Sequence, residues 1–300
     1  MKENEKYLTF ALPMVRDVIL NKPDAISNII EYSVYRASLN IQTDRRAAYK
    51  QLLYMEARHP QQVPQDFTDE IQDFFGCDAA DLMADSGEII DDYLDEFANA
   101  CECYDDVAEW YRVYLAKDVV GVKLGSIPDT IETGRKFYEM YGDGQIPVSI
   151  STLSLFVFRD KMKTEYDRVK FAMYVAIRSL AGNSVAVTTS TAIKWRMFGA
   201  RNADELKSVL LCKKMKSLYE KWTTKYYYRM MLNDLIDANL IREINYHRNT
   251  CVTASILDET KFIEAVATKI RRISQAAKWQ KVRQQKKQLQ NMLQRELNTS

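Results

Sequence analysis

Residues that interrupt helices are scarce in this sequence, with 9 glycines and 6 prolines among 300 residues. Because these two residue types mark turns and helix ends, their scarcity predicts long helices and a mainly α fold. Long apolar runs are also missing, since no stretch approaches the roughly 18–20 uncharged residues of a membrane-spanning helix. The N-terminal segment has no small-residue cleavage site of the kind that ends a signal peptide. We therefore expect a cytoplasmic protein that makes no contact with a membrane.

Residue patterns that carry metal binding or catalysis are scarce as well. Five cysteines suit neither a disulfide framework nor a zinc site, and Cys101 and Cys103 are too close for the usual ligand spacing. His59 and His247 are the only histidines, no phosphate-binding glycine loop is present, and no serine lies in a Gly-x-Ser-x-Gly turn. The carboxylates clustered in residues 91–96 are of the kind that holds Mg²⁺, but such density is usually a solvated surface. We expect no enzyme activity, no metal and no cofactor.

The net charge of +1 conceals two halves of opposite sign. Residues 1–160 contain 15 Lys and Arg against 29 Asp and Glu, whereas residues 161–300 contain 27 against 12. A cation-rich half attracts phosphate backbones, since each neutralised phosphate releases bound counterions. The split predicts either different partners for the two halves or a fold in which the halves face one another.

The first domain is expected to be an acidic helical region over residues 1–145. Lys22-Pro23-Asp24 marks a helix start. The stretch 66–109 holds sixteen acidic side chains, with apolar residues at near-helical spacing between them. It is predicted to fold into helices rather than to form a disordered tail. Three interpretations stay open: a solvated acidic face, a docking surface for a basic protein partner, and a mask over the basic half of the chain.

The second domain is expected over residues 146–265, after a loop-rich segment that places the boundary near residue 145. A short strand is expected over 145–151. Helices are then expected over residues 166–180, 190–198 and 206–219, because apolar spacing and capping residues mark each of them. A β-branched run over 185–187 predicts a short strand between the first two helices.

A further helix is expected from Thr223 or Thr224, either of which is a suitable cap, to about Ala238. Its spacing predicts a buried side made of Tyr228, Met231, Leu232, Leu235 and Ile236. Its exposed side would present Lys225, Tyr226, Arg229 and Asn233, of which Lys225 and Arg229 share a face because they lie four residues apart.

A β-hairpin is expected directly after this helix. Asn239-Leu240-Ile241 leaves the helix with Asn239 in the left-handed conformation that glycine usually adopts. The tip of the hairpin is predicted over His247 to Thr250. Residues 251–256 alternate in polarity as a return strand.

This order of elements, with Asn-Leu-Ile followed by a hairpin, resembles the winged-helix form of the helix-turn-helix domain over residues 166–256. Within that fold it resembles DNA-binding regulators and replication initiators of bacterial plasmids, phages and other mobile elements. The resemblance implies duplex DNA binding, with a recognition helix in the major groove and the hairpin on the backbone or minor groove. The implied DNA-binding residues are Thr224, Lys225, Tyr226, Arg229, Asn233, Arg248, Lys194 and Arg196. The function implied is transcription regulation or replication initiation.

The sequence departs from the winged-helix pattern at residues 203–222, where some twenty helical residues replace a short turn. Either the module is elaborated, or 203–238 is one long helix, which would put Lys225 and Arg229 in doubt as DNA contacts. Winged helices also serve as protein–protein modules. The alternative function is therefore a non-enzymatic interaction or structural module that uses the winged helix and the acidic surface.

The last segment, residues 266–300, is expected to form a basic C-terminal helix. From Lys269 to Arg295 there are nine basic residues and no acidic one, with an incomplete heptad-like apolar stripe. Such a helix lies along phosphates, pairs with its twin in a homodimer, or is a solvated terminal helix. The candidate contacts of this tail are Arg271, Arg272, Lys278, Lys281, Arg283, Lys286 and Lys287.

Overall fold

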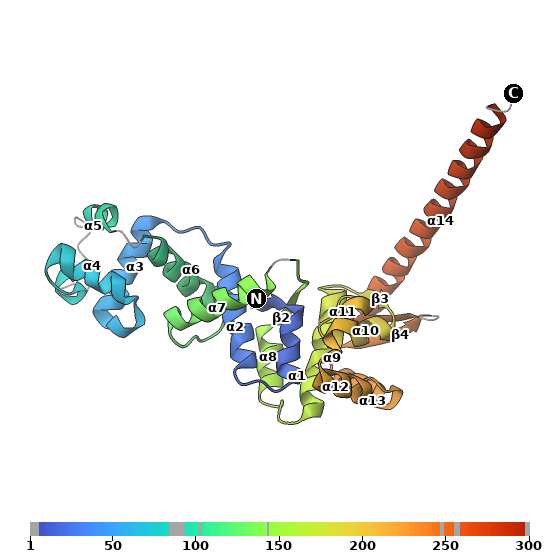
Figure 1. Cartoon of the computed structure of the whole chain (residues 1–300), viewed down its shortest axis with the longest axis horizontal. Coiled ribbons are helices and arrows are strands. Elements are labelled where there is room, and N and C mark those ends of the chain that lie inside the picture. The colour runs from blue at the N-terminus through green and yellow to red at the C-terminus, as the bar shows by residue number, and fades with distance from the viewer. Residues whose placement is uncertain are drawn as a thin grey trace.

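The computed structural model describes residues 6–83, 94–101, 104–142, 144–246, 249–254 and 259–297. The fold is mainly α, as predicted, with two small antiparallel sheets. The molecule is elongated: helices α4 (Gln65–Phe75) and α5 (Leu94–Ala100) lie at one end, and helix α14 (Glu259–Leu297) projects from the other (Figure 1). The acidic and basic segments are therefore far apart in space.

The N-terminal half consists of helices and one strand, β1 (Tyr7–Ala11). The remaining elements of this half are η1 (Leu12–Met14), α1 (Val15–Ile19), α2 (Ala25–Ser38), α3 (Arg45–Arg58), η2 (Pro60–Gln62), α4, η3 (Ala79–Leu82), α5, α6 (Tyr104–Val120) and α7 (Ile127–Tyr141). Tyr49, Phe67 and Phe97 pack their rings 5.6–5.9 Å apart between α3, α4 and α5. This aromatic core confirms folded helices in the acidic stretch, of which 84–93 and 102–103 lie outside the described residues.

The C-terminal half contains the elements that the sequence suggested for a winged helix. In chain order these are β2 (Pro147–Ser151), α8 (Thr152–Arg159), α9 (Glu165–Ala181), β3 (Ala186–Thr188), α10 (Ser190–Met197), α11 (Ala203–Val209), α12 (Lys213–Trp222), α13 (Lys225–Asp237), β4 (Arg242–Tyr246), β5 (Asn249–Thr253) and α14. Thr164 caps α9 and Thr189 caps α10, each by accepting a backbone N–H three residues on. The second sheet has the order β3-β5-β4, so the return strand of the hairpin is central.

The expected helix over 206–219 is divided into α11 and α12. Leu206 and Val209 of α11 are buried, as are Met215 and Leu218 of α12. At about 100° per residue, one continuous helix would place these two pairs on opposite faces. The break at 210–212 lets both pairs reach the core, and it leaves Leu211 83% exposed.

Strand β1 pairs antiparallel with β2, and this pairing crosses the domain boundary expected near residue 145. Thr9 is paired with Ser149 at the centre of the register, and their hydroxyl oxygens are 2.8 Å apart. Each strand is followed by a short helix and then a longer one, β1–α1–α2 and β2–α8–α9, with the 3-10 turn η1 before α1. The apolar core is continuous across both halves, from Leu8 to Ala254.

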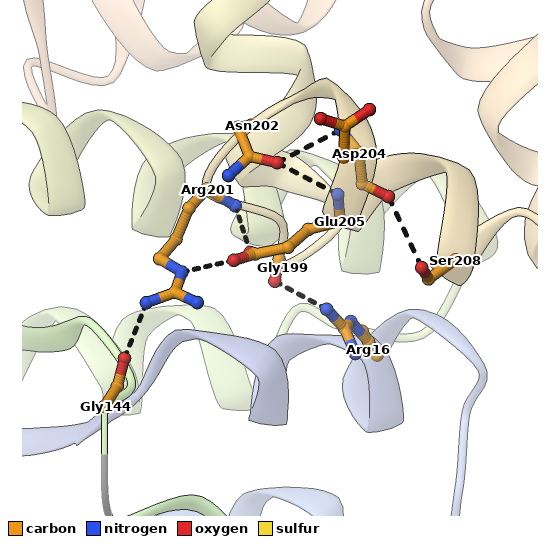
Figure 2. Close-up of polar contacts among 8 residues, drawn as sticks. All are labelled: Arg16, Gly144, Gly199, Arg201, Asn202, Asp204, Glu205 and Ser208. Carbon is orange, nitrogen blue, oxygen red and sulfur yellow. Dashed lines mark hydrogen bonds and ion pairs between the residues drawn. The ribbon is translucent and has the colours of Figure 1, made fainter.

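Polar contacts join α1 to the segment that follows α10 (Figure 2). The Arg16 guanidinium donates to the carbonyl oxygens of Phe198 (3.2 Å) and Gly199 (2.7 Å), which end α10. Arg201 donates to the carbonyl oxygen of Gly144 at 2.7 Å and pairs with Glu205. The Asn202 side chain caps α11 by accepting from the backbone N–H groups of residues 204 and 205. These bonds fix the segment between α10 and α11 against α1 and the loop before β2.

Gly199→Ala is expected to destabilise the fold by about 1–3 kcal/mol. Gly199 has a φ of 69°, and a Cβ there would lie 2.8 Å from Arg16 Nε and 3.1 Å from Pro13 Cα. The added methyl therefore brings both left-handed strain and a clash with the Arg16 side chain. Gly125→Ala is the matched control, since nothing lies within 4 Å of a Cβ at that position. Urea unfolding measures both; equal stability of the two variants would contradict the argument.

Candidate nucleic-acid interface

Helix α13 has the two faces that its sequence predicted. Tyr228, Met231, Leu232 and Leu235 are buried, and Ile236 is partly buried. The opposite face is exposed and carries Lys225, Tyr226, Arg229 and Asn233. The apolar side therefore holds the helix on the domain, while its polar side faces solvent.

Helix α13 is also a separate helix rather than the end of a longer one. Residues 203–238 form three helices, because α12 ends at Trp222 and α13 begins at Lys225. The hydroxyl of Thr224, at the N-cap position, donates backwards to the Lys221 carbonyl oxygen at 3.2 Å and makes no cap bond to α13. The expected capping role of Thr224 is therefore wrong. The first-turn N–H groups of α13, beside the exposed Lys225, consequently have no side-chain acceptor at the cap.

Arg229 links α13 to the hairpin. Its guanidinium donates to Glu243 Oε2 of β4 at 2.7 Å, and the Glu243 side chain is only 9% exposed. The Arg229 side chain remains 47% exposed. Glu243 is thus held in place by the sheet, whereas Arg229 reaches solvent from the surface of α13.

A hairpin follows α13, as expected, but its return strand is Asn249–Thr253 rather than 251–256, because Asn249 and Thr250 pair with β4 instead of forming the tip. Asn239 adopts a left-handed φ of 54°, as predicted for the exit from the helix. Strands β4 and β5 are paired from Arg242–Thr253 to Tyr246–Asn249, so that two residues connect them. Arg248, the candidate contact at the tip, lies outside the described residues.

Lys194 and Arg196 lie on α10 and are only partly exposed. Lys194 Nζ is 5.3 Å from the centroid of the Tyr228 ring on α13, and burial lowers the pKa of Lys194. Burial also lowers the pKa of Arg196. These two cations are less accessible than Lys225, and Lys194 supports the inner side of α13.

Helix α14 begins at Glu259, seven residues before the expected tail. Phe262 and Val266 dock it on Val185 of the β3 segment and Cys251 of β5. Beyond this anchor all seven candidate cations are exposed: Arg271, Arg272, Lys278, Lys281, Arg283, Lys286 and Lys287. At about 100° per residue they cover about two thirds of the circumference. The remaining third holds none of these seven cations, and over residues 270–284 this cation-free side consists of Ile270, Ile273, Ala277, Gln280 and Gln284.

An aromatic ridge lies beside α13, and the sequence alone singled out only its member Tyr226. Ring contacts run from Tyr166 to Trp222, from Trp222 to Tyr227 and from Tyr227 to Tyr226. The rings come from α9, α12 and α13, so no local spacing indicates the ridge. The adjacent tyrosines 226–228 were the only signal available in the sequence.

The acidic helices do not cover this surface. Helices α4 and α5 lie at the end of the molecule opposite α14, with α2 and α9 between them (Figure 1). Within the described ranges, His, Cys, Asp and Glu side chains form no group of three able to hold a metal ion. None of the helices in the described part has both the length and the hydropathy needed to cross a bilayer.

Comparison with protein-family models, with curated proteins and with solved structures finds no match for this chain.

Proposed function

We propose that the chain binds duplex DNA through α13, the β4–β5 hairpin and α14, in transcription regulation or replication initiation of a mobile element. One observation carries the proposal: α13 is a separate helix whose buried side anchors it and whose free side presents Lys225, Tyr226 and Arg229 beside the hairpin. An α-helix fits the major groove, where its side chains reach base edges. The biological role follows from the winged-helix resemblance alone.

Electrostatics support the same surface. The half that contains α13 and α14 carries 27 Lys and Arg against 12 Asp and Glu. Its field is little reduced by helices α4 and α5, because these lie at the end of the molecule opposite α14 and salt screens interactions between separated exposed charges. The basic face of α14 extends the positive surface away from the domain, where phosphates can approach it.

The alternative is a protein-interaction module, and the cation-free side of α14 favours it. Ile273 is 46% exposed there, on a helix that projects beyond its anchor away from the other described elements (Figure 1). Pairing of two such helices would bury this side and form a homodimer. Such a dimer is compatible with DNA binding. A module that binds only proteins releases no counterions from phosphates, so its binding lacks the steep salt dependence expected for DNA.

Salt titration of DNA binding tests the proposal. The whole chain is the material to use, because a fragment beginning at residue 150 lacks β1 and most of β2. We expect affinity for duplex DNA to fall by about 10³–10⁵ between 50 and 200 mM salt if 6–10 phosphates are contacted. Absent or salt-insensitive binding would refute the proposal. Protein complexes that survive nuclease treatment would then favour the interaction module.

The double variant Lys225→Gln with Arg229→Gln is expected to weaken binding to a cognate site more than binding to random DNA. The expected difference is about 1–3 kcal/mol for each side chain that reads a base. The reason is that both side chains point outward from the proposed recognition helix. Lys136→Gln with Arg58→Gln removes the same charge from exposed positions in the acidic half and serves as the matched control. Binding curves on both DNAs give the result. Equal weakening on the two DNAs would limit Lys225 and Arg229 to the phosphate backbone.

A further inference from the structure

The aromatic ridge ends in the exposed ring of Tyr226. Its centroid distances are 5.6 Å from Tyr166 to Trp222, 4.8 Å from Trp222 to Tyr227 and 5.2 Å from Tyr227 to Tyr226. Trp222 is buried, Tyr166 and Tyr227 are half-buried, and Tyr226 is 71% exposed. The ridge thus leads from the core to solvent, and Tyr226 stands at its outer end in the first turn of α13.

Hydrogen bonds hold the inner part of the ridge. Trp222 Nε1 donates to Glu165 Oε1 at 2.7 Å, and Lys221 Nζ donates to the same oxygen at 2.8 Å. The Tyr166 hydroxyl donates to Asp234 Oδ2 at 2.7 Å. Since the inner rings are fixed in this way, Tyr226 contacts a firm support and loses little freedom when a ligand covers it.

The carboxylates near the ridge are engaged by protein cations. Glu165 is paired with Lys221, and Lys170 pairs with both Asp167 and Asp234. Lys221 Nζ also lies 4.5 Å from the Trp222 ring centroid. Exposed Lys225 directly precedes Tyr226. The outer end of the ridge therefore combines an accessible π-face with adjacent positive charge, which is the chemistry that binds unpaired nucleic-acid bases.

Intact duplex DNA offers little to such a ring, because each base face is covered by its neighbours in the stack. A base becomes available only where the duplex is unpaired or a step is opened. Every base has a π-face, so this contact needs no particular sequence. The position of Tyr226 on the exposed side of α13 places it at the DNA surface if α13 is the recognition helix.

We propose that Tyr226 stacks on an unpaired or unstacked base, so that the protein prefers DNA with a local opening over fully paired DNA. This inference rests on the proposed function, because it requires α13 to lie on DNA. The inference adds a substrate class, locally opened duplex, for a surface that is otherwise proposed to bind fully paired DNA.

Two probes of one sequence test the proposal on the whole chain: a fully paired duplex, and the same duplex with a central unpaired bubble. Tyr226→Leu keeps apolar bulk but removes the ring, and is expected to lower affinity for the bubble probe roughly 5- to 150-fold. Tyr226→Phe keeps the ring and is expected to bind like the unmodified chain. Quenching of 2-aminopurine placed in the bubble reports stacking directly. Because Tyr226 is exposed, both variants are expected to fold, and thermal unfolding checks this.

The outcomes separate this proposal from the proposed function. A larger loss of affinity for the bubble probe than for the paired duplex in Tyr226→Leu, absent in Tyr226→Phe, supports the stacking contact. Equal bubble affinity of Tyr226→Leu and the unmodified chain overturns it, while salt-dependent binding of the paired duplex leaves the proposed function standing. Absence of salt-dependent binding to either probe overturns both.

Discussion

A chain whose seven tail cations are replaced by glutamine is expected to lose on the order of 10³-fold in affinity for DNA at 50 mM salt. The expected loss assumes that about three phosphates lie against the basic face of α14 at one time. The slope of log affinity against log salt should then fall by about 0.9 for each neutralised phosphate, or about 2.7 in total. The reason is geometric, since all seven side chains are exposed on a helix that projects from the domain.

A second variant controls for loss of the helix. Replacing each Arg by Lys and each Lys by Arg at the same seven positions keeps the charge. This variant should keep most of the slope of log affinity against log salt. Glutamine has nearly the helix propensity of Lys and Arg, so circular dichroism should show helix in both variants. An unchanged slope in the glutamine variant would show that α14 does not touch DNA, and would leave α13 and the hairpin as the whole interface.

Arg178→Met is expected to destabilise the fold by about 2–4 kcal/mol. Arg178 is only 5% exposed and donates to the Ser149 carbonyl oxygen at 2.8 Å, the Ala254 carbonyl oxygen at 3.4 Å and Asn183 Oδ1 at 3.0 Å. Methionine has similar length but no donor, so these three acceptors lose their partner. The change should therefore loosen β2, the end of β5 and the turn after α9 together.

Urea unfolding measures the effect of Arg178→Met, and Arg168→Met on the same helix is the control. Arg168 is half-buried and makes only a 3.4 Å bond to the Lys163 carbonyl oxygen, so its replacement should cost far less. A loss below about 1 kcal/mol for Arg178→Met would show that water or local rearrangement satisfies the three acceptors.

Local patterns predicted much of the C-terminal half. The faces of α13 follow from the spacing of Tyr228, Met231, Leu232 and Leu235, because side chains three and four apart share one side of a helix. Thr189 and Asn202 cap helices where hydroxyl and amide side chains usually do so. The backbone of Asn239 is left-handed, as predicted from its place between the helix and the hairpin. Each of these features depends on residues within about one or two turns.

Features that depend on distant residues were not predictable. Strand β1 was expected to belong to a helical region, because its partner is 140 residues away. The aromatic ridge joins three helices, and the Arg229–Glu243 ion pair joins a helix to a strand. The break between α11 and α12 was detectable, since the buried positions shift to the opposite helix face between Val209 and Met215.

The pairing of β1 with β2 also sets an order of events during synthesis. At about 5–20 residues per second, β1 leaves the ribosome roughly 7–28 s before its partner strand is complete. During that interval Phe10 and its neighbours have an open strand edge, which is the kind of surface that pairs with other chains. We expect nascent chains that stop before residue 151 to aggregate or to recruit chaperones, and release to follow once β2 is made.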